Sequence, residues 1–272
     1  NIISAAGTFT LAYLMANKII NQDLYFGSVY FYLHFQYNGW FLFTIFALFF
    51  SQMKERMQAK HIRLADLFFY LLLVTLIPAW FLSMLWMRVP GWMNTTGAIA
   101  AVVQTIALLV FIRLLVLMRY QFRLVLHPPV HHIWLIAVIA FSFKIILQGL
   151  SSIPVLNQYA FGIRPILIGF LHLVLLGFVS MFIIGYLLQN RVAYLPTKLA
   201  FGGLWLFASA MFLNELVLMS QGLAAIFYIS FPYSNELLLV AACGMFCGLL
   251  LLYREQTSKY AALHPVTGQV NR

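Results

Sequence analysis

Long stretches of apolar residues, separated by short polar connections, constrain this chain more than any other feature of its sequence. A helix needs about 20 mostly apolar residues to cross the hydrocarbon core of a bilayer. Eight such stretches run near residues 2–17, 28–51, 66–87, 97–118, 132–150, 163–188, 199–219 and 236–253. Because backbone polar groups inside lipid must bond within their own segment, the sequence predicts an all-α bundle of about eight transmembrane helices.

The scarcity of charged residues supports the same fold class. Only 8% of the residues are charged and 64% are apolar, whereas soluble domains carry about 25% charged residues. The lipid bilayer is therefore the expected partner of most of the surface. The formal net charge is +10, but the basic residues lack interleaved aromatic side chains, so no nucleic acid is expected to bind.

The basic residues alternate between the connections. Those after the second, fourth, sixth and eighth stretches hold eleven Lys and Arg residues, and the other connections hold three. Since cytoplasmic loops carry the excess of positive charge, both ends of the chain are predicted to face the cytoplasm.

The domain plan is simple. Residues 1–272 are expected to form one transmembrane domain, truncated at its N-terminus because Asn1 opens directly into an apolar stretch. Residues 254–272 are expected to form a cytoplasmic tail. The segment 223–232 is too short to span a bilayer and contains Pro232, which predicts an interfacial or re-entrant piece.

Polar side chains inside the predicted spans mark candidate functional positions, because charge is costly in lipid. They are His34, Asn38, Lys144, Gln148, His172, Asn214 and Glu215. At about 1.5 Å per residue from the predicted helix ends, His34 lies roughly 9 Å and His172 roughly 13 Å below the outer face. Lys144 lies roughly 10 Å below it, and Glu215 is expected to be shallower. The sequence therefore predicts a polar cluster in the outer half of the membrane.

Two imidazoles at similar depth on different helices form a candidate metal centre. His34 and His172 are candidate ligands of haem b or of copper. Haem propionates are anions, so Arg88, Arg164 and Lys144, on the same side, are candidate partners for a bound haem. An equally open alternative is that each histidine only forms a hydrogen bond between helices.

The remaining polar residues have structural alternatives of their own. Lys144 and Glu215 are expected to neutralise each other as a structural ion pair, in preference to forming a proton relay. Asn38, one turn after His34, is expected to orient that ring or to bond to a neighbouring helix.

Two histidine-containing runs carry a family resemblance. Val29–Phe41 and Arg164–Gly177 resemble a group of bacterial membrane proteins that is similar in layout to the NnrS family. More distantly, that group is similar to the catalytic subunit of haem–copper oxidases. The resemblance implies a twelve-helix haem or haem–copper protein, of which this chain would hold the last eight helices, and a link to nitric-oxide tolerance with a small gaseous ligand. The oxidase pattern of additional histidines is missing, since residues 66–87 contain none and His172 stands alone.

Three functions therefore remain open. The first is a haem- or copper-binding membrane protein of respiratory or nitric-oxide-stress metabolism, with its status as an enzyme undecided. The second is a transporter or channel with a polar path at Lys144, Gln148 and Glu215. The third is a non-catalytic subunit associated with other membrane subunits. No nucleotide-binding loop or hydrolase motif is present.

Overall fold

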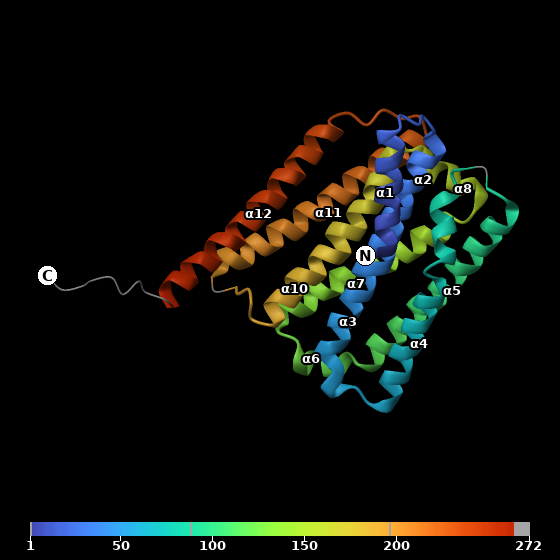
Figure 1. Ribbon diagram of the computed structural model, residues 1–272. Helices are drawn as coiled ribbons and strands as arrows, with labels where there is room; N and C mark the ends of the chain where they lie inside the picture. Colours follow the sequence, from blue (N-terminus) through green and yellow to red (C-terminus); the bar gives the residue numbers. More distant parts are fainter. Residues whose placement is uncertain (1, 88, 196, 264–272) are drawn as a thin grey trace.

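The computed structural model describes residues 2–87, 89–195 and 197–263. The chain is 86% helical, and these residues include no strand, which confirms the predicted all-α fold. Figure 1 shows most helices gathered into one bundle, with α11 and α12 side by side along one edge.

The helices follow one another with few residues between them. The α-helices are α1 (Ile2–Ala16), α2 (Gln22–His34), α3 (Leu42–Met53), α4 (Ala59–Thr75), α5 (Gly91–Leu117), α6 (Arg119–Val125), α7 (Pro128–Leu150), α8 (Pro154–Gly162), α9 (Arg164–His172), α10 (Met181–Gln189), α11 (Lys198–Ile226) and α12 (Ser234–Leu263). The π-helical segments η1 (Phe35–Phe41) and η4 (Leu173–Ser180) join α2 to α3 and α9 to α10. The 3₁₀ segments η2 (Lys54–Arg56) and η3 (Pro78–Met84) follow α3 and α4.

Several helices are long and apolar enough to cross a membrane, so the chain is of the multi-pass type. Among the described residues these are α5, α7, the continuous α9–η4–α10 helix, α11 and α12, which makes five. The pair α4 and η3, bent by 51°, makes a sixth. The predicted number of eight is not confirmed: α1 has only 15 residues, and the α2–η1–α3 run is divided by its π-helical segment.

Some helix ends differ from the predicted ones. The second predicted helix begins at Gln22 instead of residue 28, because the Asn21 side chain accepts a hydrogen bond from the Leu24 N–H at 2.9 Å and caps the helix there. The fourth begins at Gly91 instead of residue 97, directly after Pro90. Each of these helices therefore begins about a turn and a half earlier than its apolar stretch indicated.

The C-terminal helices are longer than predicted. Because α11 continues to Ile226, the first part of the predicted interfacial segment 223–232 belongs to a long helix. Because α12 continues to Leu263, the first part of the predicted tail 254–272 is helical. Residues 264–272 of that tail lie outside the described part of the chain.

The third predicted helix is broken. The expected continuous span 66–87 ends as an α-helix at Thr75 and resumes as η3 from Pro78, with a bend of 51° between the two pieces. Proline has no N–H, and its ring clashes with the preceding turn, so an α-helix does not continue regularly through Pro78. The break frees the backbone carbonyl of Leu76, which accepts a hydrogen bond from another helix.

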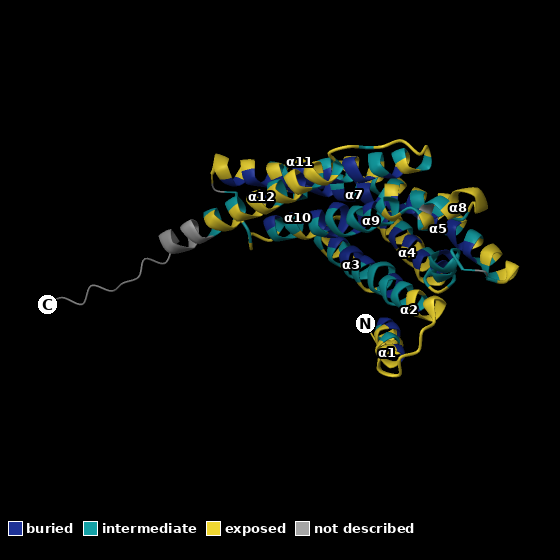
Figure 2. Cartoon of the chain, turned by 90° about the horizontal axis from the view of Figure 1, so that it is seen from above, coloured by how far each residue is buried: buried dark blue, intermediate teal, exposed yellow. Residues whose placement is uncertain are grey.

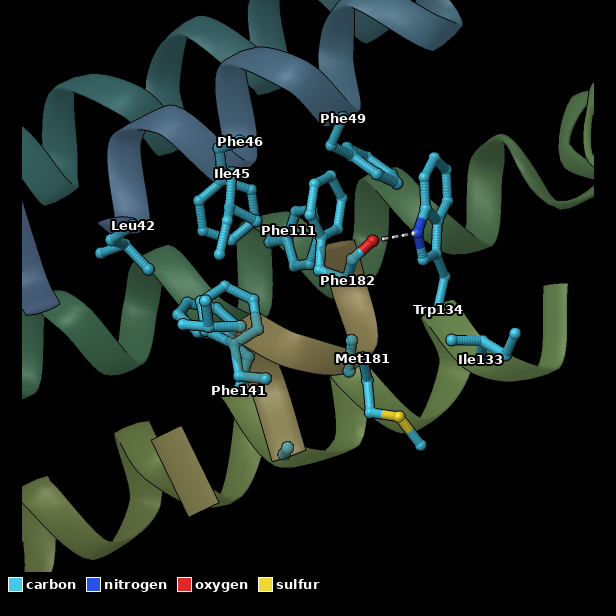
Figure 3. Close-up of a cluster of buried hydrophobic side chains, with 14 of the residues drawn as sticks. Leu42, Ile45, Phe46, Phe49, Phe111, Ile133, Trp134, Phe141, Met181 and Phe182 are labelled. Atoms are coloured by element: carbon cyan, nitrogen blue, oxygen red, sulfur yellow. Dashed lines mark hydrogen bonds between the residues drawn. The ribbon is translucent and has the colours of Figure 1, made fainter. Parts of the chain in front are cut away.

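A cluster of aromatic rings fills the half of the bundle opposite α8. This aromatic core consists of Phe46, Phe49, Phe68, Phe111, Trp134, Phe141, Phe178 and Phe182. Phe46 meets the Phe111 and Phe141 rings edge to face, with ring centroids 5.1 Å apart in each pair. The Trp134 ring stacks on Phe182 at 5.2 Å, and its Nε1–H donates to the Phe182 carbonyl oxygen at 3.2 Å (Figure 3). The core therefore leaves only a small cavity, of about 20 Å³, between these rings in this half of the bundle.

The periphery is apolar and open. Figure 2 shows α1 and much of α12 as largely exposed helices at the margin of the bundle. α12 packs on α11 where Gly203 and Gly248 meet with no room for an added Cβ, and α1 approaches α2 at Gly7. Their exposed apolar faces are of the kind that lipid covers.

Candidate functional site

A cavity of about 410 Å³ lies at the end of the bundle that carries α8, next to the aromatic core. Its walls come from α2, η1, η3, α7, α8, α9, η4 and α11, and they are mainly apolar. The polar side chains on its lining are those of Tyr30, His34, Tyr37, Asn38, Ser83, Lys144, Gln148, Ser151, Tyr159 and Glu215. A volume of this size is typical of sites for small organic molecules.

Helix α7 contributes two buried polar groups to this cavity. Lys144 and Gln148 are four residues apart and therefore share one helix face. Lys144 is 3% exposed, and its Nζ has no hydrogen-bond partner among the described residues. Gln148 is 8% exposed, and its Oε1 likewise has no partner there. An ammonium in this position is an anion-binding group that no described residue satisfies.

Glu215 lines the same cavity from α11 but does not pair with Lys144. Its Oε1 instead accepts a hydrogen bond from Asn214 Nδ2 at 3.3 Å. The expected Lys144–Glu215 ion pair is therefore not formed in this structure. Glu215 lies roughly 16 Å along the axis from the end of α11 at Ile226, because that helix continues past its apolar stretch.

Both ring nitrogens of His34 have partners. Nε2–H donates to the carbonyl oxygen of Leu76 at 2.8 Å, and Nδ1 accepts from Asn38 Nδ2 at 3.1 Å. A carbonyl can only accept, so the proton lies on Nε2. His34 thus binds the carbonyl that the α4–η3 break sets free, and Asn38 orients its ring. This interhelical role is the alternative to metal binding that the sequence leaves open for His34.

His172 lies at the end of α9 and is half-buried. Its Nδ1 accepts a hydrogen bond from Asn214 Nδ2 at 2.9 Å, and the same amide nitrogen donates to Glu215. Since both contacts use one amide nitrogen, they agree on the orientation of Asn214 and place the His172 proton on Nε2. Asn214, only 4% exposed, therefore connects His172 to the carboxylate at the cavity wall.

The hydrogen bonds of His34 and His172 bear on their candidate role as ligands of haem or copper. A ligating imidazole needs an unprotonated nitrogen directed at the metal, whereas one nitrogen of each ring accepts from an asparagine and the other carries the proton. No group of three or more His, Cys, Asp or Glu side chains that could hold a metal ion occurs among the described residues. The haem and copper predictions stay predictions.

Among the described residues, Lys144 is the candidate propionate partner on the cavity lining. Arg164 is exposed at the start of α9, whereas Lys144 is buried at the cavity wall. Arg88 lies outside the described residues. Of the predicted polar set, His34, Asn38, Lys144, Gln148 and Glu215 share the cavity lining, and His172 and Asn214 lie behind it.

Two features of the site were missed in the sequence. The short helix α8 lines the cavity with Leu156, Tyr159 and Phe161 and is held by Asn157 Nδ2, which donates to the Leu85 carbonyl at 2.7 Å. Pro154, at the first position of α8, is a helix-start signal. The π-helical segments η1 and η4, each beginning directly after a histidine, have no clear signature in the sequence.

Comparisons with known proteins add no further constraint. The chain matches no family model and no curated protein. The resemblance of Val29–Phe41 and Arg164–Gly177 to proteins of NnrS-like layout therefore stays a prediction.

Proposed function

We propose that this protein binds an amphipathic organic anion inside the membrane and transports it, with Lys144 as the anion-binding group. The observation that carries the proposal is the Lys144 Nζ, buried at the cavity wall without a partner among the described residues. A buried charge without a partner destabilises a protein by several kcal/mol. A bound anion offsets this cost.

The cavity lining supports the substrate class. Around the polar groups, the walls consist of hydrocarbon and aromatic side chains, among them Phe143, Phe161 and Phe170. Such walls accept an apolar or aromatic body and offer few polar contacts to a fully hydrophilic solute. The expected ligand therefore combines one anionic group with a hydrocarbon or aromatic part of modest size.

The aromatic core favours transport by alternating access, and not conduction through an open channel. Phe141 lies three residues before Lys144 on α7, roughly 4.5 Å further along the helix axis, and belongs to the aromatic core. Figure 3 shows it beside Phe46 and Phe111 among the aromatic rings between the helices. A ligand at Lys144 is thus blocked on that side, as in one end state of a transporter.

The proposed location is a bacterial inner membrane with both ends of this chain in the cytoplasm. The alternation of basic residues, eleven in one set of connections and three in the other, supports the orientation. The bacterial inner membrane is what the NnrS-like resemblance implies. In this orientation the α8 end of the bundle, and with it the cavity, faces outward. The aromatic core then closes the cytoplasmic side.

A binding measurement tests the proposal directly. The probe is 2-naphthalenesulfonate, a permanently ionised aromatic anion, titrated into protein in lipid nanodiscs. Loss of the partner of a buried charge costs about 2 kcal/mol or more, so Lys144→Gln is expected to weaken binding at least about 30-fold. Lys198→Gln, at an exposed lysine at the start of α11, is the matched control and keeps the affinity. Equal affinity of the wild type and Lys144→Gln contradicts the proposal.

Uptake into proteoliposomes then separates transport from binding alone. Wild-type protein is expected to accumulate the same anion inside vesicles, and Lys144→Gln is not. Binding without uptake reduces the function to that of a binding protein or of a non-catalytic subunit in a larger assembly.

Haem or copper binding is a second candidate, favoured by the position of η1 and η4 directly after His34 and His172, since π-helical segments often occur at functional sites. Under this candidate the protein belongs to respiratory or nitric-oxide-stress metabolism, as the NnrS-like resemblance implies. A reduced-minus-oxidised visible spectrum, with iron and copper quantified, tests it. A pigment that His172→Ala abolishes supports it, and a folded, colourless and metal-free protein contradicts it.

A further inference from the structure

We infer that binding of the anion is coupled to the uptake of one proton by Glu215, which makes the protein a proton–anion symporter. This inference rests on the proposed function. The starting observation is that Lys144 and Glu215 line the same cavity. The Lys144 Nζ has no partner among the described residues, and the Glu215 carboxylate accepts a hydrogen bond from Asn214.

The charges of the lining give the reason for the coupling. Lys144 and Glu215 are the lysine and the acidic residue on the cavity lining, so the empty cavity is neutral when both are ionised. A monoanion bound at Lys144 adds one negative charge to an apolar cavity, where uncompensated charge is costly. A proton on Glu215 restores neutrality. One proton from solution then bonds to one carboxylate oxygen, and no other bond changes.

The groups around Glu215 do not neutralise it in another way. Of the elements packed against α11, α9 contributes His172, which reaches Glu215 through Asn214, and the exposed Arg164 at its start. α12 contributes the exposed Glu236 in its first turn, and η4 contributes no titratable side chain. Across the cavity stands Lys144. Within the described part of the chain, no salt bridge reaches the Glu215 carboxylate, and Asn214 is its hydrogen-bond donor.

Asn214 is a positioning residue in this scheme. Its amide nitrogen holds Glu215 Oε1 at 3.3 Å and His172 Nδ1 at 2.9 Å. These contacts fix one carboxylate oxygen and leave Oε2 as the oxygen that takes the proton. Replacement of Asn214 by leucine is therefore expected to move the pH at which proton uptake is half-maximal, while the maximal number of protons stays the same.

The experiment counts protons by calorimetry. Binding of 2-naphthalenesulfonate to the wild type is measured at several values between about pH 6 and pH 9, each in two buffers of different ionisation enthalpy. The probe does not titrate in this range, so the dependence of the heat on the buffer gives the protons taken up by the protein. The wild type is expected to approach one proton per anion at the alkaline end. No proton uptake at any pH, with normal binding, overturns the inference.

Two variants assign the proton to its site. Glu215→Gln imitates the neutral acid, so it is expected to bind the anion with one proton fewer taken up than the wild type at the same pH. Glu236→Gln, at the exposed carboxylate of α12, is the matched control and keeps the wild-type proton number. Undiminished uptake in Glu215→Gln overturns the assignment. Failure of the wild type to bind the probe is a different result, since it refutes the proposed function itself.

Discussion

Replacement of Lys144 by methionine tests whether the Lys144 ammonium serves to bind a ligand or to stabilise the fold. The side chain is 97% buried, because only 3% is exposed, and its Nζ has no hydrogen-bond partner among the described residues. Methionine has a similar length and no charge, so it fills the same space without the cost of a buried ammonium. Apolar replacement of buried ionic groups stabilises proteins by about 1–4 kcal/mol. At roughly 2–4 °C per kcal/mol for a chain of this length, the midpoint of unfolding is expected to rise by roughly 2–16 °C.

The assay is thermal unfolding in a neutral detergent, followed by circular dichroism, without and with 2-naphthalenesulfonate. At about one hundred times its dissociation constant, a ligand stabilises the folded state by about 2.7 kcal/mol. The wild type is expected to show this shift, and Lys144→Met is expected to start higher and to show none. Lys198→Met, at an exposed site, should leave both quantities unchanged. A lower midpoint for Lys144→Met than for the wild type would refute the reasoning, since it would mean that the ammonium supports the fold.

Two further predictions concern packing and the helix break. A Cβ on Gly185 would meet Trp134 inside contact distance, so Gly185→Ala is expected to destabilise the protein by about 1–3 kcal/mol. Gly202→Ala, with open space around it, should be neutral or slightly stabilising in the same denaturation series, and equal effects of the two would contradict the packing argument. His34→Leu leaves the Leu76 carbonyl without its donor and is expected to cost about 1–3 kcal/mol of unfolding free energy. Partial recovery in His34→Gln, which keeps an N–H donor, would identify the hydrogen bond as the cause, and no loss in His34→Leu would exclude it.

The fold class could be predicted from the sequence because a protein surface with so few charged residues is stable only in contact with lipid. The helix ends are less predictable from the sequence. An apolar stretch shows which residues are suited to lipid, and a helix can begin before that stretch or continue past it. Asn21 caps α2 before the apolar residues begin, and α11 continues past them to Ile226. Pro78 is different, since its effect on an α-helix is general and its position inside the stretch 66–87 is plain in the sequence.

The candidate site was predictable as a set of residues and not as a set of contacts. Depth along a helix can be counted from the sequence, so the grouping of Lys144, Gln148 and Glu215 was accessible. Which side chains touch depends on the rotation of each helix about its axis and on rotamers, and neither is encoded in spacing alone. For this reason the sequence spacing did not reveal that Lys144 and Glu215 remain unpaired. It also did not reveal that Asn214, next to Glu215 in sequence, is the hydrogen-bond partner of Glu215.

The two π-helical segments have a consequence for insertions and deletions. Each residue of an α-helix turns the chain by about 100° and advances it by about 1.5 Å, so the loss of one residue inside a regular span such as α7 rotates one half of its side chains against the other. A π-helical turn already holds a surplus residue, because its hydrogen bonds reach one position further. Removal of one residue within η1 or η4 would return that stretch to α-helical winding and leave both flanking faces nearly in place. A one-residue gap at residues 35–41 or 173–180 in an alignment would therefore mark a change of helix type, whereas the same gap in α7 would mark a different packing of the bundle.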